Sequence, residues 1–239
     1  MTDDTRDRLI EECVEETMAD YGNTIFQSSS RNQYRIIRVK RILKRTVWAL
    51  QQQIRQGEFE PGEFEVSFSM EDSLSAINID LSEHEKMRLR GRIDRVDLCE
   101  TDDKVYVKII DYKTGNTSLD LVALYYGLQL QLAVYLDAAM ELEQKKHPGK
   151  QVEPAGVFYY HIDDPMLDQE EDETDEAWGR RMLKALRMDG LVNADRKVVE
   201  LLDRVLEDGT TIRCDSGWKE EGWKLYELFE SSVRRSSLM

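Results

Sequence analysis

Hydrophobic positions in the first quarter of the chain recur at helical spacing. From residue 3 to residue 21 apolar side chains return every three or four residues, and the Gly-Asn pair that follows is a common helix stop. The same spacing returns between residues 31 and 56, where it leaves most Lys and Arg side chains on the opposite face. We therefore expect two amphipathic helices, over residues 3–21 and 31–56.

The pattern then changes to alternation of apolar and polar residues, which is typical of strands with one buried face. We expect short strands at residues 64–70 and 77–81. Two longer alternating runs come next, at residues 86–100 and 104–113. The short polar stretch between these two runs predicts that they form a β-hairpin.

The rest of the chain combines helices with one buried strand. Leu and Val dominate residues 119–142, which predicts a single long helix, and the apolar run 155–162 predicts a buried strand. Further helices are expected near residues 175–188, 195–207 and 217–235. This order of strands and helices predicts an α/β fold, in which helices flank a mixed central β-sheet.

Composition limits the class of protein. No apolar run approaches the ~18 residues of a membrane span, and the first residues lack the pattern of a signal peptide, so we expect a cytoplasmic protein that does not contact membranes. Cys13, Cys99 and Cys214 are far apart and show no Cys-x-x-Cys spacing. This spacing argues against both a zinc site and a disulfide framework.

Charge is distributed unevenly along the chain. The net charge of −15, taken alone, argues against nucleic acid as a partner, because phosphates are bound through Lys and Arg. Residues 163–176, however, contain nine acids and no base, whereas residues 31–57 contain eight Lys or Arg and no acid. We expect the acidic run to be a mobile loop that is either solvated or binds a basic partner in place of DNA.

The basic helix carries a candidate DNA-binding face. Its outward positions include Arg35, Arg38, Arg41, Lys44 and Arg45. These side chains either contact the DNA backbone or form a solvated basic face, and the sequence leaves both alternatives open.

Two aspartates and a lysine end the hydrophobic stripe of the predicted hairpin. If Asp102 and Asp103 form the turn, Asp94 lies directly across from Asp111, and Lys113 leaves its strand on the same side as Asp111. Adjacent carboxylates repel each other unless a cation offsets their charge, and Mg²⁺ is typically held by one or two carboxylates together with water and phosphate oxygens. The pattern predicts metal-dependent phosphodiester hydrolysis, in which Lys113 activates water or stabilises negative charge.

Ordinary surface ion pairs are the alternative explanation of the same residues. Asp94 would then pair with Arg92 or Arg95, and Asp111 with Lys113 or Lys108. Glu65, on the strand before the hairpin, is either a further acid near the site or an exposed strand residue.

A glutamine and a tyrosine interrupt the apolar pattern of the 119–142 helix. Gln131 and Tyr135 are four residues apart and therefore share a face. Gly127, one turn earlier on that face, would leave room for a close approach. The two polar side chains either contact the carboxylates or the nucleic-acid backbone, or they form a hydrogen-bonded pair in the core.

The segments "GRIDRVD", "IIDYKTG" and "LQLQLAVY", in this order, resemble the RecB-type branch of the PD-(D/E)XK nuclease superfamily, whose motifs read G-x-x-D, D-x-K and Q-x-x-x-Y. The later segments "FYYHIDDPM" and "LRMDGLVNADRKVVELLDR" resemble the stretch after these motifs in the B subunit of AddAB-type ATP-dependent helicase-nucleases, so the similarity covers about residues 60–235. It implies a restriction-endonuclease-like core. By resemblance, Asp94, Asp111 and Lys113 are catalytic, the two aspartates bind the metal, and Gln131 with Tyr135 forms an accessory motif.

The resemblance also implies groups that this sequence does not supply. Family members usually carry a metal-binding histidine near the start of the domain, whereas His84, His147 and His161 stand in other contexts. B subunits of this type typically hold an iron-sulfur cluster on four cysteines, and the chain has three. We expect the chain to be an excised domain of a larger helicase-nuclease subunit, or a natural variant without the cluster.

The expected domain organisation is one nuclease domain over residues 1–239. It comprises a helical N-terminal part (1–58), a catalytic sheet and helix (60–165) and a helical C-terminal part (166–239). We expect an Mg²⁺- or Mn²⁺-dependent deoxyribonuclease, an exonuclease that acts on single-stranded DNA ends in bacterial double-strand-break repair and recombination, with the helicase-nuclease A subunit as partner. The alternatives are a catalytically silent module of the same fold that binds nucleic acid or serves as a scaffold, and a protein-interaction domain based on the acidic run.

Overall fold

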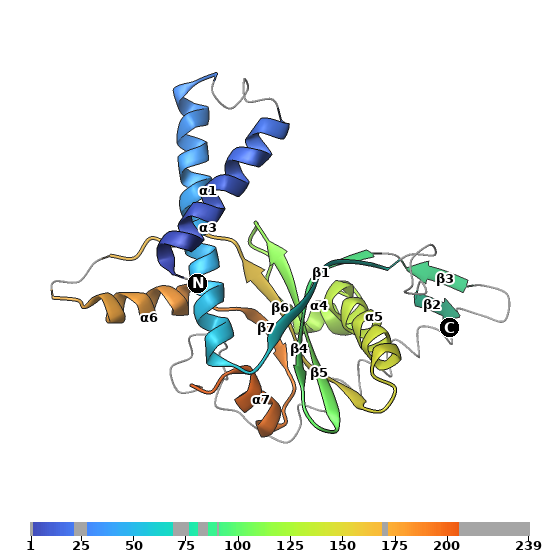
Figure 1. Ribbon diagram of the computed structural model, residues 1–239. Coiled ribbons are helices and arrows are strands. Elements are labelled where there is room, and N and C mark those ends of the chain that lie inside the picture. The colour runs from blue at the N-terminus through green and yellow to red at the C-terminus, as the bar shows by residue number, and fades with distance from the viewer. Residues whose placement is uncertain are drawn as a thin grey trace.

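The computed structural model of the chain describes residues 2–21, 28–68, 77–80, 86–89, 91–168 and 172–205, and for 77–80 and 86–89 it describes the backbone alone. Figure 1 shows a central sheet with helices on both faces, while α1 and the N-terminal half of α3 project away from it. Within the described ranges no helix is long and apolar enough to cross a membrane.

The two N-terminal helices form as the apolar spacing predicts. Helix α1 spans Asp3–Asp20 and helix α3 spans Ser30–Gln56. Thr2 caps α1 by accepting a hydrogen bond from the backbone N–H of Thr5, and Ser29 caps α3 in the same way through the N–H of Asn32. Such caps satisfy backbone donors that have no partner inside the helix. Both predicted helices are therefore confirmed.

The central sheet is mixed, as predicted. Its strands stand in the order β1-β4-β5-β6-β7, with β5 and β6 parallel and the other neighbours antiparallel. The strands are β1 (Glu60–Phe68), β4 (Gly91–Glu100), β5 (Lys104–Lys113), β6 (Gln151–His161) and β7 (Asp189–Val192). Strands β2 (Ile77–Asp80) and β3 (Lys86–Leu89) pair with each other in a separate two-stranded sheet. The predicted 86–100 strand is thus two strands, which belong to different sheets.

The hairpin of β4 and β5 has the predicted register. The N–H of Thr101 donates to the carbonyl of Lys104 at 2.8 Å, so Asp102 and Asp103 form the turn. Arg95 lies opposite Ile110 and Val96 opposite Ile109. One more step along the strands brings Asp94 beside Asp111.

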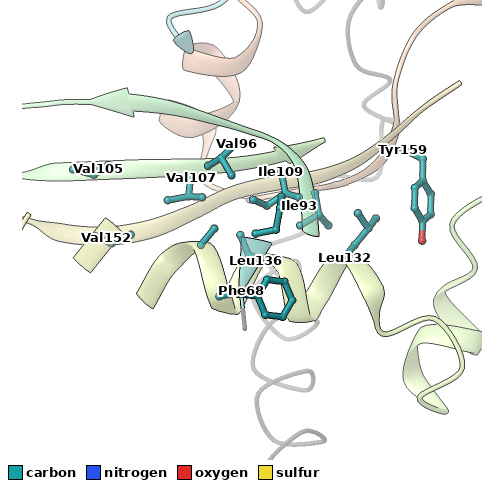
Figure 2. Packing of buried hydrophobic residues seen from close by; sticks show 13 residues of the cluster. Phe68, Ile93, Val96, Val105, Val107, Ile109, Leu132, Leu136, Val152 and Tyr159 are labelled. Carbon is teal, nitrogen blue, oxygen red and sulfur yellow. The ribbon is translucent and has the colours of Figure 1, made fainter. Parts of the chain in front are cut away.

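Each face of the sheet has its own hydrophobic core. Helix α5 (Gln131–Lys146) covers one face, where Leu132 and Leu136 pack on Val107 and Ile109 (Figure 2). On the opposite face α7 (Arg196–Leu202) and the C-terminal half of α3 pack against Ile110, Phe158 and Tyr160. Helix α6 (Asp175–Ala185) lies against α3 through a smaller cluster around Ala49. The sheet is therefore buried on both faces, which explains the continuous apolar run of β6.

The helix predicted over residues 119–142 is broken into two. Helix α4 spans Leu121–Tyr125, and α5 begins at Gln131. Gly127 has φ of 76°. Its N–H donates to the carbonyl of Leu124, and that of Leu128 donates to the carbonyl of Ala123, which is the Schellman pattern of a helix end. The prediction that Gly127 leaves room for a close approach is wrong, because among the described residues a Cβ there would meet just Leu130, at 3.9 Å.

The acidic run is partly anchored to the body of the protein rather than mobile throughout. Asp164 pairs with Arg41 and Arg45, and Glu173 pairs with Arg181. Thr174 then caps α6, whose first turn contains the last two acids of the run. Strand β7 was not predicted, and the helix predicted at 217–235 lies outside the described residues.

A cluster of charged side chains is buried on the α7 side of the sheet. The guanidinium of Arg95 donates two hydrogen bonds to the carboxylate of Asp97, at 2.6 and 2.8 Å. The ammonium of Lys108 lies 2.7 Å from the same carboxylate, and burial lowers its pKa. A further N–H of Arg95 donates to the hydroxyl of Tyr112 at 3.3 Å. One buried carboxylate thus holds two buried cations.

Candidate active site

The C-terminal end of β5 brings a carboxylate and an ammonium group together. Asp111 is buried, and Oδ2 of its carboxylate lies 2.6 Å from Nζ of Lys113. The two side chains lie on the same side of β5, because residues two apart in a strand share a face. Strand β5 is the central strand of the sheet, and both residues pair with β6, Asp111 opposite Tyr159 and Lys113 opposite His161.

Asp94 reaches this group from the neighbouring strand. Its Oδ2 accepts a hydrogen bond of 2.9 Å from the backbone N–H of Tyr112, between Asp111 and Lys113. Asp94 is therefore fixed at the predicted position rather than turned outward toward an arginine.

Lys113 is held on three sides. Its ammonium donates to Oε1 of Gln131 at 3.0 Å, faces Asp111, and lies 5.2 Å from the centre of the Tyr159 ring. The ring belongs to β6, which runs parallel to β5 and places Tyr159 beside Asp111. A cation above an aromatic face is stabilised by the negative charge density of the ring.

Gln131 joins the carboxylate, the lysine and the tyrosine. Its Nε2 donates to Oδ1 of Asp111 at 3.1 Å and to the hydroxyl of Tyr135 at 3.0 Å, while its Oε1 accepts from Lys113. A primary amide supplies two donors and an acceptor, and all three functions are used here. Neither a carboxylate nor a hydroxyl at this position would reproduce that set of contacts.

The glycine of the G-x-x-D segment makes room for the tyrosine. A Cβ on Gly91 would lie 2.7 Å from Cζ of Phe68 and 3.1 Å from Cε1 of Tyr135. These two rings pack edge to face, with their centroids 5.9 Å apart. The ring of Tyr135 therefore lies directly against the backbone of β4, which lets its hydroxyl reach Gln131.

Electrostatics at the site favour a bound cation. Burial raises the pKa of Asp111, the ammonium of Lys113 opposes that rise, and the charge of Asp94 adds to it. Oδ2 of Asp111 is shielded from solvent and receives no well-directed hydrogen bond from the described residues. An atom of this kind fits a metal ligand, because carboxylate oxygens are the ligands that Mg²⁺ and Mn²⁺ prefer.

The donor set for such a cation is small. In the part of the chain that the structure describes, no three His, Cys, Asp or Glu side chains come together in a way that would hold a metal. Asp94 and Asp111 would therefore be the side-chain ligands, with the remaining positions left to water and phosphate oxygens, as is usual for Mg²⁺.

Comparison with known protein families decides the identity of this fold. Residues 1–217 match the PD-(D/E)XK nuclease superfamily. The chain belongs to this superfamily. The mixed five-stranded sheet with flanking helices is accordingly a PD-(D/E)XK core, which confirms the predicted fold class.

Individual relatives of this PD-(D/E)XK chain agree with that assignment. It is 49% identical over 203 residues to the B subunit of an ATP-dependent helicase/deoxyribonuclease of Lachnoclostridium phytofermentans, covering 85% of this chain and 16% of the relative. It is 42% identical over 213 residues to the B subunit of the same name in Alkaliphilus metalliredigens, covering 89% of this chain and 18% of the relative. The chain thus spans less than one fifth of the length of these curated relatives.

The other acidic, histidine and cysteine side chains considered as possible ligands in this PD-(D/E)XK chain do not join the candidate active site in the described residues. Glu65 is exposed and pairs with Arg92 at 2.8 Å, so it is an exposed strand residue, as the second of the two interpretations had it. His147 caps α5, and His161 ends β6 with Nε2 2.6 Å from the carbonyl oxygen of Thr117. His84 lies outside the described residues. Cys13 is exposed and Cys99 is buried, and both are free thiols.

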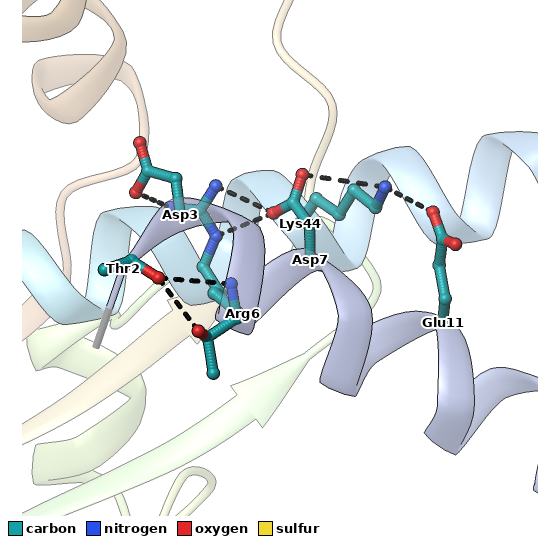
Figure 3. Close-up of polar contacts among 7 residues, drawn as sticks. Thr2, Asp3, Arg6, Asp7, Glu11 and Lys44 are labelled. Carbon is teal, nitrogen blue, oxygen red and sulfur yellow. Dashed lines mark hydrogen bonds and ion pairs between the residues drawn. The ribbon is translucent and has the colours of Figure 1, made fainter.

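The basic helix is partly neutralised from within the chain. Lys44 lies 2.6 Å from Glu11 and 3.6 Å from Asp7 of α1, and Asp7 in turn pairs with Arg6 (Figure 3). Lys40 pairs with Glu15 in the same way. The acidic face of α1 therefore covers part of the basic face of α3.

The other predicted DNA-binding residues fall into two groups. Arg41 and Arg45 are held by Asp164, whereas Arg35 and Arg38 are exposed and form no ion pair with the described residues. Three of the five predicted side chains thus form ion pairs within the chain, although Arg41 remains half exposed. Whether this helix contacts DNA stays a prediction, and Arg35 with Arg38 are the side chains open to it.

Two aromatic residues of the site were missed at the level of sequence. Tyr159 and Phe68 support Lys113 and Tyr135, yet each looks like an ordinary apolar strand residue. Tyr159 could have been identified from its position opposite Asp111 in the sheet, but that position requires knowledge of the parallel pairing of β5 with β6.

Proposed function

We propose that the chain is the catalytic domain of a metal-dependent deoxyribonuclease that hydrolyses phosphodiester bonds of single-stranded DNA ends. The observation that carries the proposal is the group of Asp94, Asp111 and Lys113, held together by Gln131. Its relatives are named as B subunits of an ATP-dependent helicase/deoxyribonuclease, and this name supports DNA as the substrate and a helicase subunit as the partner.

Each residue of the group has a role in this proposal. Asp94 and Asp111 would hold Mg²⁺ or Mn²⁺, which when bound would neutralise charge on the phosphate and activate the attacking water. Lys113 donates to a phosphate oxygen and stabilises the negative charge that develops as the bond breaks. Gln131 is a positioning residue, because it acts through Asp111 and Lys113, and Tyr135 fixes the amide of Gln131.

The proposal is tested by cleavage of labelled DNA in the presence of Mg²⁺, Mn²⁺ or EDTA. We expect the chain to degrade single strands faster than the matching duplex, with no cleavage in EDTA. Cleavage that persists in EDTA would overturn the metal requirement, and equal rates on both substrates would overturn the single-strand preference. An intact strand under all conditions would favour the catalytically silent module of the same fold.

Replacing Gln131 by alanine should slow cleavage without unfolding the protein. Residues that orient metal ligands are typically worth about 10- to 100-fold in activity, and we expect a loss of that size in kcat with little change in KM. Gln131→Glu should lose at least as much, since it removes both donors and adds a negative charge beside Asp111.

The matched control for this substitution is Gln144→Ala. Gln144 is also exposed on α5 and bonded through its amide, to the carbonyls of His147 and Lys150, but it lies at the far end of the helix. We expect its kcat to equal that of the parent chain. A similar loss of kcat in both variants would contradict a positioning role for Gln131.

A further inference from the structure

An exposed apolar surface adjoins the candidate active site. Five large apolar side chains in and just after α4 are between 44% and 79% exposed to solvent. They are Leu121, Val122, Tyr125, Tyr126 and Leu128, and we call them the α4 surface. Helix α4 has no buried residue at all. An apolar patch of this kind marks an interaction site on a protein surface.

The segment that carries the α4 surface begins and ends at the active site. Residues 114–130 leave the sheet after Lys113 and return at Gln131, and these two flanking residues are hydrogen-bonded to each other at 3.0 Å. The segment is thus a loop whose two ends meet at the proposed catalytic group. The α4 surface ends at Leu128, three residues and therefore at most about 11 Å of chain from Gln131.

Hydrogen bonds fix the conformation of residues 114–130. Asp120 caps α4 by accepting from the N–H groups of Val122 and Ala123. Gly127 ends the helix, and the N–H of Leu119 donates at 2.9 Å to the carboxylate of Asp189, the first residue of β7. The apolar side chains are thus presented outward from a short helix whose two ends are both hydrogen-bonded within the protein.

Charge and ring geometry indicate the occupant. The net charge of the chain is −15, yet residues 114–130 contain one acid, the capping Asp120, and no base. The segment itself therefore adds little to the repulsion that a polyanion meets. The rings of Tyr125 and Tyr126 meet edge to face, 5.3 Å apart at 84°, so the two do not stack on each other. Exposed aromatic rings of this kind stack on unpaired bases. In a duplex, neighbouring base pairs cover the faces of the bases and prevent such stacking.

We propose that the α4 surface stacks the unpaired bases that neighbour the bond to be cut, and that it thereby selects single strands for the site. The inference rests on the proposed function, since it names the structural basis of the single-strand preference. Tyr125 and Tyr126 are the specificity-determining residues. Stacking requires a base with a free face, and a duplex end offers one such face per strand, whereas a single strand offers one at every nucleotide.

The test is the binding of two oligonucleotides of equal length in EDTA, one single-stranded with thymine bases and one with abasic sugars. Stacking on aromatic side chains contributes about fivefold or more in affinity per base. We expect the parent chain to bind the thymine strand at least about 25-fold more tightly than the abasic strand. The double variant Tyr125→Ala, Tyr126→Ala should bind both strands with the weaker affinity.

Two controls keep the result specific to the rings. The variant Tyr125→Phe, Tyr126→Phe keeps both aromatic faces and should retain the affinity of the parent chain. The thermal unfolding midpoint of the alanine variant should stay unchanged, since both side chains are exposed. If the parent chain binds both oligonucleotides equally, or the alanine variant binds like the parent, the proposal is overturned, and the surface would then be one for an apolar protein partner.

Failure of this proposal can be told apart from failure of the nuclease assignment, because binding is measured without cleavage. Base-dependent binding by a chain that cuts no DNA would support the stacking surface and contradict the proposed function. Cleavage of single strands by a chain that binds thymine and abasic strands equally would support the proposed function and contradict the stacking surface.

Discussion

Replacing Asp111 by alanine is expected to reduce DNA cleavage by on the order of 10³-fold, which corresponds to the several kcal/mol that a metal contributes to a transition state. The carboxylate lies beside Asp94, Lys113 and Gln131, so its loss removes a proposed metal ligand and leaves the lysine without its charge partner. The measurement is the rate of release of labelled fragments from single-stranded DNA in Mn²⁺.

The fold should survive this substitution. Burial raises the pKa of Asp111 above its ordinary value, so the folded chain binds this proton more tightly than the unfolded chain does. Ionisation of such a group lowers the free energy of unfolding as pH rises, so at neutral pH the charged form stabilises the fold less than the protonated form would. Lys113 keeps 23% of its side chain exposed, so water can solvate its ammonium group once the carboxylate is gone. We expect the thermal midpoint of Asp111→Ala at neutral pH to stay close to that of the parent chain.

Asp102→Ala is the matched control. It removes the same charge from the same hairpin, at the exposed turn rather than at the site. Its cleavage rate should equal that of the parent chain. If Asp111→Ala also cleaved at the parent rate, the catalytic assignment of Asp111 would be wrong.

The second large effect is expected on stability, from Asp97→Ala. This substitution removes the one carboxylate that Arg95 and Lys108 share inside the sheet, at distances of 2.6 to 2.8 Å. Removing one partner of a buried ion pair typically costs about 3–5 kcal/mol, because the remaining charge stays buried without compensation. Two cations are left here, so we expect a loss at the upper end of that range, measured by urea unfolding.

Glu141→Ala provides the comparison for this loss. Glu141 lies 2.7 Å from Lys145, a separation equal to that of Asp97 and Lys108, but both partners are about half exposed. Surface pairs contribute little, because water replaces the lost partner. The urea midpoint of Glu141→Ala should hardly move. If Asp97→Ala were equally mild, then Arg95 and Lys108 would find water or another acceptor once the carboxylate is gone.

The arrangement of Asp94, Asp111 and Lys113 was predictable because its geometry depends on periodicity and on the length of one turn. A two-residue turn at Asp102 and Asp103 sets the register of the hairpin, and the register brings Asp94 to Asp111. Lys113 follows from the alternation of strand side chains. The positions of Gln131 and Tyr135 follow from helical spacing, and both lie within α5.

The sequence predictions that proved wrong concern features set by tertiary contacts, which a local apolar pattern does not reveal. The run from Leu121 to Leu136 is almost uniformly apolar, so the end of α4 at Gly127 had no counterpart in the hydrophobic spacing. The division of the 86–100 run into β3 and β4 depends on which strand each half pairs with. The pairing of Lys44 with α1 depends on how the two helices pack, and the composition of a single helix does not reveal it.

The central position of β5 in the sheet predicts that this strand opens less readily than α4. Strand β5 is hydrogen-bonded to β4 on one side and to β6 on the other, whereas α4 buries none of its side chains. Free energies of local opening follow such differences in packing, so amide hydrogens of β5 should exchange with solvent only when the whole domain unfolds, while those of α4 exchange through brief local openings. If the α4 surface binds single-stranded DNA as proposed, the strand could bind and dissociate there through local motion of α4, without any displacement of Asp111 and Lys113.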